Sequence, residues 1–69
     1  MNSIGIVVNG QSMEVTTGTT IEGLLGQLQI KSPAIAVEVN EELRPRNDFS
    51  KSVLAQGDRL EIVTLVGGG

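Results

Sequence analysis

The sequence ends in three consecutive glycines, Gly67, Gly68 and Gly69, which follow Val66 directly. Glycine has no Cβ, so such a segment can enter a narrow channel that would exclude any other residue. Three extended residues reach about 10 Å, at roughly 3.3–3.6 Å each. We therefore expect the Gly69 carboxylate to be the reactive group, presented to the active site of another protein. A frayed chain end or a remnant of protein expression is the alternative that the glycines alone leave open.

Other groups that could perform chemistry are scarce. The chain contains no histidine and no cysteine, which are common general bases, nucleophiles and metal ligands. Without histidine, a serine or threonine nucleophile would need a lysine or an amino terminus to activate it. The lysines are Lys31 and Lys51, and neither lies in a recognisable motif. We predict that the protein is not an enzyme, has no catalytic residue and no metal site, and binds no cofactor itself.

Composition also disfavours nucleic-acid and membrane partners. The formal net charge is −3, with five Lys and Arg against eight Asp and Glu, and the only aromatic residue is Phe49. Nucleic-acid binding requires clustered positive charge and commonly uses stacking rings. No apolar run approaches the length of a membrane span, and the first residues lack the basic start and apolar core of a signal peptide. We expect a cytoplasmic protein.

The first sixteen residues predict a β-hairpin. Apolar residues alternate with small or polar ones before and after residues 9 and 10, which is the period of a strand with one buried face. Asn9 and Gly10 suit a two-residue type I′ turn, because both residues of that turn need a positive φ.

The next segment predicts one helix, from about Thr20 to Gln29. Apolar residues recur there at helical spacing, at Ile21, Leu24, Leu25 and Leu28. Thr19 and Glu22 have the spacing of a capping box. Gly23 and Gly26 lie inside the helix and each cost it about 1 kcal/mol relative to alanine. Either they face solvent, or the missing Cβ allows a close approach to the sheet or to a partner.

Strands and turns make up the second half of the chain. Ser32–Pro33 should break the helix, and residues 34–39 alternate as a strand with Ile35, Val37 and Val39 on one face. A turn at residues 40–42 leads to a short strand near Leu43 and Arg44. Residues 45–52 are irregular, with one short helical turn that places Phe49 and Leu54 against the core. After a turn at Gly57–Asp58, residues 59–66 form the last strand.

This order of elements, β-β-α-β-β-β, predicts one small α+β domain. Its first and last strands can lie parallel in the middle of a mixed sheet of four to five strands, with one helix packed across one face. This is the β-grasp, or ubiquitin-like, arrangement. We expect residues 1–66 to form the domain and residues 67–69 to form a flexible C-terminal tail.

Several short segments, in this order and spacing, match one protein family. They are Val8–Asn9–Gly10, Thr20, Leu24–Leu25, Ala36–Val37–Glu38–Val39–Asn40, Pro45–Arg46, Gly57–Asp58, Glu61–Ile62–Val63 and Val66–Gly67–Gly68–Gly69. On these segments the chain resembles the ThiS-type sulfur carrier proteins of thiamine biosynthesis, in the ThiS/MoaD ubiquitin-like superfamily. Glu41 stands where glycine is frequent in that family, and Phe49 where a larger aromatic residue is often found. The first departure leaves the geometry of that turn open.

The resemblance implies a chemical role for the tail. An E1-like activating enzyme would use ATP to adenylate the Gly69 carboxyl group, and a sulfur donor such as a cysteine desulfurase system would convert it to a thiocarboxylate. Thiazole synthase would then receive the sulfur. Two alternatives remain: the small subunit of molybdopterin synthase, which has the same tail chemistry, and a ubiquitin-like modifier or interaction domain with an inert tail.

The last strand predicts a surface for these partners. If Leu60 and Ile62 face the helix, Val63 and Leu65 lie on the open face of the sheet. Together with Val66 they would form an apolar surface at the root of the tail, suited to docking. The alternative is that residues 45–52 partly cover Val63 and Leu65, so that both serve the core.

Overall fold

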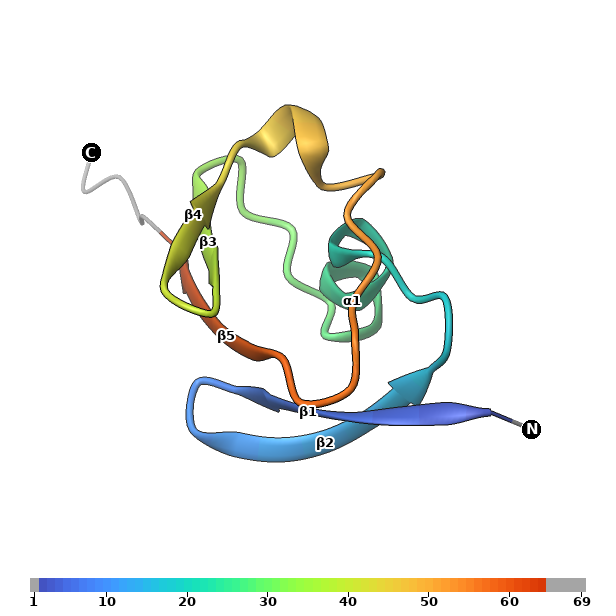
Figure 1. Cartoon of the computed structure of the whole chain (residues 1–69). Coiled ribbons are helices and arrows are strands. Elements are labelled where there is room, and N and C mark those ends of the chain that lie inside the picture. The colour runs from blue at the N-terminus through green and yellow to red at the C-terminus, as the bar shows by residue number, and fades with distance from the viewer. Residues whose placement is uncertain (1, 65–69) are drawn as a thin grey trace.

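The computed structural model of the protein describes residues 2–64, and Met1 and residues 65–69 lie outside the described part. Five strands form one sheet there, and a single α-helix covers one of its faces (Figure 1). The elements are β1 (Ser3–Val8), β2 (Gln11–Thr16), α1 (Ile21–Gln27), β3 (Ile35–Val39), β4 (Glu42–Arg44), the 3-10 turn η1 (Arg46–Asp48) and β5 (Arg59–Thr64).

The strands lie in the order β2-β1-β5-β3-β4, with β1 and β5 parallel and the other neighbouring pairs antiparallel. This is the predicted mixed sheet of the β-grasp fold. The first hairpin is also confirmed, because β1 and β2 pair in register from Ser3–Thr16 to Val8–Gln11. Its turn residues Asn9 and Gly10 have φ angles of 50° and 83°, as a type I′ turn requires.

The start of α1 differs from the predicted capping box. The N-cap is Thr20, whose Oγ1 accepts a hydrogen bond from the Gly23 N–H at 3.0 Å. Thr19 instead donates its hydroxyl to the Thr16 carbonyl at 2.6 Å, in the preceding turn. With the cap one residue later, the third helical position is Gly23 and not Glu22, so no side chain can return the bond to the cap.

The helix also ends earlier than predicted, at Gln27, with Leu28 as its C-cap. Gln29 has a left-handed φ of 59°. Its N–H donates to the Gly26 carbonyl at 3.1 Å, and the N–H of Ile30 donates to the Leu25 carbonyl at 3.0 Å. This pair of bonds is a Schellman motif, so the local conformation at Gln29 terminates the helix before Ser32–Pro33 is reached.

Both helix glycines lie on the exposed side of α1. A Cβ on Gly26 would meet nothing within 4 Å, and one on Gly23 would come nearest to the Thr20 hydroxyl, at 3.4 Å. No backbone of the sheet approaches either residue. Of the two interpretations, solvent exposure is therefore confirmed and a close approach to the sheet is wrong.

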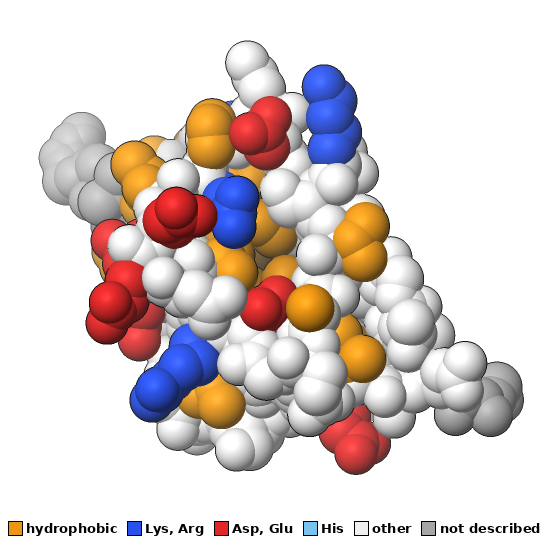
Figure 2. All heavy atoms as spheres, in the orientation of Figure 1, with side chains coloured by type: hydrophobic (Ala, Val, Ile, Leu, Met, Phe, Trp, Pro, Cys, Tyr) orange, Lys and Arg blue, Asp and Glu red, His pale blue; other side chains and the backbone are white. Residues whose placement is uncertain are grey.

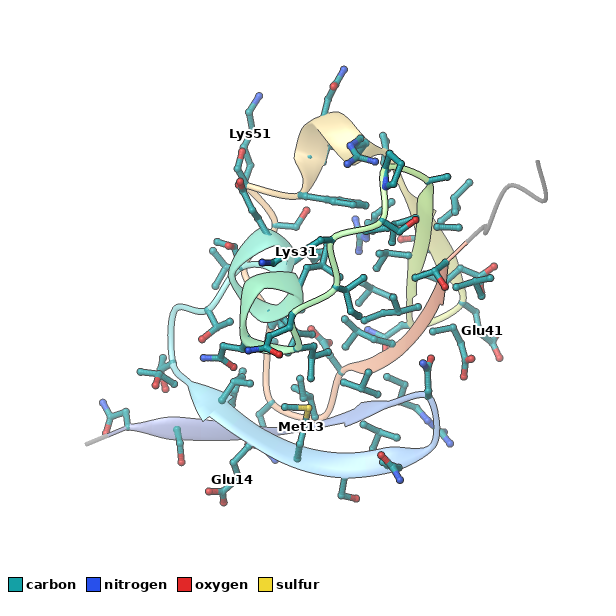
Figure 3. All side chains as sticks on the ribbon, turned by 180° about the vertical axis from the view of Figure 1, so that it is seen from behind. Met13, Glu14, Lys31, Glu41 and Lys51 are labelled. Atoms are coloured by element: carbon teal, nitrogen blue, oxygen red, sulfur yellow. The ribbon has the colours of Figure 1, made fainter. Side chains whose placement is uncertain are left out.

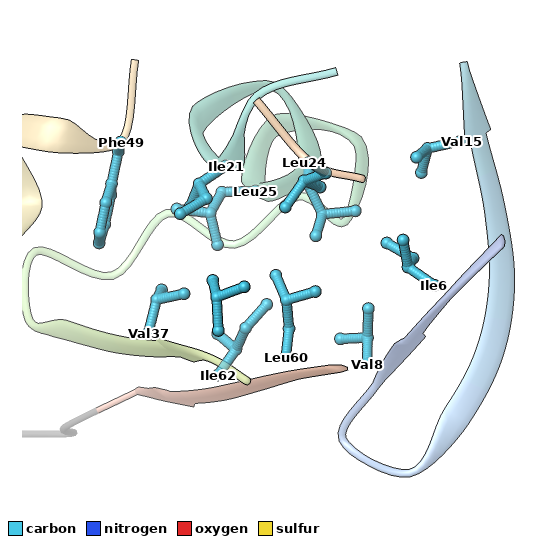
Figure 4. Packing of buried hydrophobic residues seen from close by; sticks show 12 residues of the cluster. Ile6, Val8, Val15, Ile21, Leu24, Leu25, Val37, Phe49, Leu60 and Ile62 are labelled. Atoms are coloured by element: carbon cyan, nitrogen blue, oxygen red, sulfur yellow. The ribbon is translucent and has the colours of Figure 1, made fainter. Parts of the chain in front are cut away.

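The core lies between α1 and the covered face of the sheet. Ile21, Leu24 and Leu25 point from the helix toward apolar side chains of β1, β3 and β5 (Figure 4). The buried hydrophobic residues are Ile6, Val8, Val15, Ile21, Leu24, Leu25, Val37, Val39, Phe49, Leu54, Leu60 and Ile62. Phe49 and Leu54 come from the segment between β4 and β5, which confirms their predicted place against the core. Within residues 2–64, no polar or charged residue is buried.

The turn between β3 and β4 carries local strain. Asn40 and Glu41 have φ angles of 53° and 68°, so both adopt the left-handed conformation of a type I′ turn. Asparagine tolerates this region well. For other residues with a side chain it costs roughly 1–2 kcal/mol, so Glu41 is the unfavourable member of the pair.

Glu41→Gly should therefore stabilise the protein, by about 0.5–1 kcal/mol after the greater entropy of glycine in the unfolded chain is taken into account. Urea unfolding measures the change. Glu42→Gly is the control, because Glu42 lies within β4, where glycine should destabilise by about 0.5–1 kcal/mol. A less stable Glu41→Gly variant would mean that the Glu41 side chain contributes more to the free energy of unfolding than its left-handed backbone conformation costs.

Candidate functional site

The predicted reactive end follows β5 in the sequence. In β5, the residues from Leu60 to Thr64 pair with β3, and Arg59 and Leu60 pair with β1. The last described pair joins Thr64 to Ile35. The tail residues Gly67, Gly68 and Gly69 and the predicted docking residues Leu65 and Val66 lie outside the described residues.

The predicted register of β5 is confirmed as far as Thr64. Leu60 and Ile62 face α1 and are 1% and 7% exposed, whereas Val63 lies on the opposite face and is 51% exposed. Val63 is thus not part of the core, so the alternative that it serves the core is wrong, and Leu65 lies outside the described residues.

Two further apolar residues share the open face with Val63. Ala36 lies directly opposite Val63 in the β3–β5 pair. Leu43 of β4 is 67% exposed and lies opposite Glu38, which places it on the same side of the sheet because cross-strand partners share a face. We call Ala36, Leu43 and Val63 the open-face patch.

Carboxylates border the open-face patch. Glu38 lies directly opposite Glu61 in the β3–β5 pair, and Arg59 follows the same face of β5. Figure 2 shows acidic side chains gathered at the left edge of the view, where Figure 1 places β3, β4 and β5. The one ion pair within residues 2–64 joins Arg44 to Glu42 at 3.5 Å, so neither Glu38 nor Glu61 forms an ion pair with a described residue.

The two lysines lie away from the open face. Lys31 and Lys51 lie on the helix side, whereas Glu41 lies at the β3–β4 turn near β5 (Figure 3). On β2, Met13 and Glu14 point to opposite faces of the sheet (Figure 3), as strand alternation requires. On the open face, β3 and β5 thus carry two carboxylates, Glu38 and Glu61, and one arginine, Arg59, and both lysines lie elsewhere.

The described part of the chain offers no constellation for catalysis. Between Asn2 and Thr64, no three acidic side chains come close enough together to hold a metal ion. In the same range, no helix combines the length and apolar character that crossing a bilayer requires. The described residues provide instead a strand, β5, that is paired with β3 as far as Thr64 and exposes Glu61 and Val63 on the open face of the sheet.

A sequence profile of the ThiS family matches residues 6–69. The chain belongs to the ThiS family. This ThiS-family chain is 28% identical over 64 residues to the sulfur carrier protein ThiS of Escherichia coli (strain K12), a match that covers 93% of this chain and 97% of that protein. It is also similar to a crystal structure of the thiamine biosynthesis protein ThiS from Geobacter metallireducens, with a TM-score of 0.81, 28% identity, and coverage of 96% of this chain and 100% of that one.

A larger protein contains a similar segment. The thiazole synthase of Paramagnetospirillum magneticum is 39% identical to the ThiS-family chain over 64 residues, covering 93% of this chain and 20% of that synthase. The chain therefore spans about a fifth of the length of that relative. The family and the β-grasp fold predicted from the sequence are both confirmed.

Proposed function

We propose that this protein is a sulfur carrier for thiazole formation in thiamine biosynthesis. The observation that carries the proposal is the ThiS-family match, which extends through Gly69 and includes all three terminal glycines. Proteins of this family carry sulfur and do not catalyse its transfer. A carrier needs no acid, base or metal of its own, in keeping with a chain that has no histidine and no cysteine.

The proposed chemistry takes place at Gly69. A carboxylate is a poor electrophile, so the carboxylate oxygen first attacks the α-phosphorus of ATP in an E1-like activating enzyme, forming an acyl adenylate and releasing pyrophosphate. A persulfide sulfur from a cysteine desulfurase system then attacks the carbonyl carbon and expels AMP. A thiol cleaves the resulting acyl disulfide and becomes part of a disulfide itself, which leaves a thiocarboxylate on Gly69. ATP is thus used by the partner and is not a cofactor of this chain.

Thiazole synthase is the proposed recipient of the sulfur. The P. magneticum thiazole synthase contains a segment that is similar to nearly all of this chain. Joining two modules in one chain raises their effective concentration for each other, which is useful when they act on each other. This supports a carrier–synthase pair here, and disfavours the alternatives of a molybdopterin synthase subunit and a protein modifier.

Growth of bacterial mutants tests the proposed pathway. Expression of the chain in a strain that lacks its own ThiS-type carrier should restore growth without thiamine, and a variant lacking Gly69 should not. The second strain to use lacks the small subunit of molybdopterin synthase. Restored molybdoenzyme activity in that strain, with no rescue of the first, would show that the molybdopterin alternative is correct.

The activating enzyme is proposed to dock on the open-face patch, continued by Leu65 and Val66. Ordering the backbone of each glycine in the enzyme's channel costs about 1–2 kcal/mol, which contacts elsewhere must offset. Val63 is a large apolar residue exposed one position before the end of β5, and Leu43 is another, exposed on β4 opposite Glu38. Glu38 of β3 and Glu61 of β5 lie directly opposite each other on neighbouring strands. Two like charges in this arrangement are unfavourable in the isolated protein. A partner surface with aliphatic side chains and a lysine or arginine would cover the patch and neutralise these carboxylates.

Val63→Glu should weaken binding to the activating enzyme at least about tenfold, because it places a charge in an apolar contact beside two other carboxylates. The unfolding midpoint should stay close to that of the wild type, since Val63 is half exposed. Val53→Glu is the matched control: Val53 is 61% exposed and lies outside the patch, so its binding should not change. Equal binding by both variants would show that the enzyme docks elsewhere.

A further inference from the structure

The two neighbours of β5 do not follow it equally far toward the tail. On one side, β3 pairs with β5 as far as Thr64. On the other side, the paired residues of β1 are Val7 and Val8, opposite Arg59 and Leu60. The chain then turns away into β2, so the later part of β5 has no strand partner on the β1 side.

The side chain of Asn9 takes the place of the missing strand. Its Oδ1 accepts a hydrogen bond from the Ile62 N–H at 2.8 Å, and its Nδ2 donates to the Ile62 carbonyl at 3.2 Å. The Asn9 backbone N–H donates to the Leu60 carbonyl at 2.9 Å. A single side chain thus satisfies both backbone groups of Ile62, which a continued strand would otherwise have paired.

Asn40 makes a similar contact at the other end of β5. Its Oδ1 accepts from the Arg59 N–H at 3.0 Å, and its Nδ2 donates to Asp58 Oδ1 at 3.0 Å. Like Asn9, it is the first of two left-handed residues in a hairpin turn. Both asparagines therefore hydrogen-bond to β5 through the side-chain amide. Asn40 contacts the first residue of the strand, and Asn9 contacts both backbone groups of Ile62, two positions before Thr64.

We infer that Asn9 is a positioning residue for the reaction at Gly69, an inference that rests on the proposed sulfur-carrier function. An activating enzyme that binds the folded domain needs the Gly69 carboxylate at a fixed distance from the surface of the domain that it contacts. If the end of β5 is held on one side only, the point from which the tail leaves the body shifts relative to that surface. Misplacement by about 1 Å can slow an enzymatic step up to about a hundredfold, so the amide of Asn9 contributes to turnover as well as to stability.

Asn9→Gly and Asn40→Gly form a matched pair for the test. Glycine adopts the left-handed conformation readily, so each variant keeps its turn and loses two side-chain hydrogen bonds. Asn9→Gly loses both bonds to Ile62, and Asn40→Gly loses one bond to Arg59 and one to Asp58. Thiocarboxylate formation is followed by intact mass at limiting activating enzyme with ATP and a sulfur donor, at a temperature where circular dichroism shows both variants folded. We expect Asn9→Gly to react about tenfold more slowly, a smaller loss than the hundredfold that a full 1 Å misplacement can cause. Asn40→Gly should stay within about twofold of the wild type, since its contact lies at the far end of the strand.

Asn9→Asp provides a second variant. Aspartate also tolerates a positive φ and keeps an acceptor for the Ile62 N–H, but it loses the donor and places an oxygen against the Ile62 carbonyl. Its rate should also fall, and amide exchange of Ile62 should accelerate in both Asn9 variants but not in Asn40→Gly. Equal slowing in Asn9→Gly and Asn40→Gly, or wild-type rates in the Asn9 variants, would overturn the inference. A wild-type protein that gains no sulfur would contradict the proposed function instead.

Discussion

Deletion of Gly68 and Gly69 should abolish thiocarboxylate formation and change the free energy of unfolding by less than about 0.5 kcal/mol. The reaction is lost because the remaining chain is too short to bring its carboxylate to the same place in the activating enzyme. Stability is retained because the described core is complete without these residues: its buried residues all lie between Ile6 and Ile62. Mass spectrometry and urea unfolding of the same preparations measure the two effects.

Gly68→Ala is a smaller change to the same tail. It keeps the length of the tail and adds one Cβ, which should impair activation if the channel of the activating enzyme is narrow. Normal turnover of this variant would show that the channel is not narrow. A large fall in melting temperature on deletion would show that the glycines belong to the folded structure.

Leu60→Ala should cost about 2–5 kcal/mol of stability. Leu60 is 1% exposed, lies in a central strand and faces the helix, so its loss leaves a cavity between the two layers. A chain of this size has a total stability of roughly 3–10 kcal/mol, and the variant should be partly unfolded at physiological temperature. Val63→Ala, on the exposed face of the same strand, should cost less than about 1 kcal/mol. Similar losses in both variants would contradict the assigned faces of β5.

The strands were predictable because their period is short and their turns are marked. Asn9–Gly10 signals a two-residue turn, and alternation on either side of it fixes which face is buried. The ends of α1 were harder to predict. Thr19 and Thr20 are adjacent and either could cap the helix, and the choice depends on the Thr19 hydroxyl already bonding Thr16. At the other end, Gln29 adopts a left-handed conformation that sequence rules assign to glycine or asparagine.

The site was predictable in part for similar reasons. The exposure of Val63 follows from the register of a six-residue strand. Leu43 was not recognised, because β4 has three residues and alternation over so short a strand does not define its faces. The contact between Asn9 and Ile62 joins residues 53 positions apart, and it arises only because β1 and β5 are neighbours in the folded sheet. From the sequence, Asn9 had a role in the turn and no visible role at β5.

The most direct measurement of the central claim is the mass of the intact protein after incubation with its activating enzyme, ATP and a sulfur donor. One oxygen should be replaced by one sulfur, and fragmentation should localise the sulfur to Gly69. The change should not occur when ATP is omitted, because the carboxylate must first be adenylated. An unchanged mass, with an activating enzyme that modifies its own known carrier in the same preparation, would contradict the proposed function.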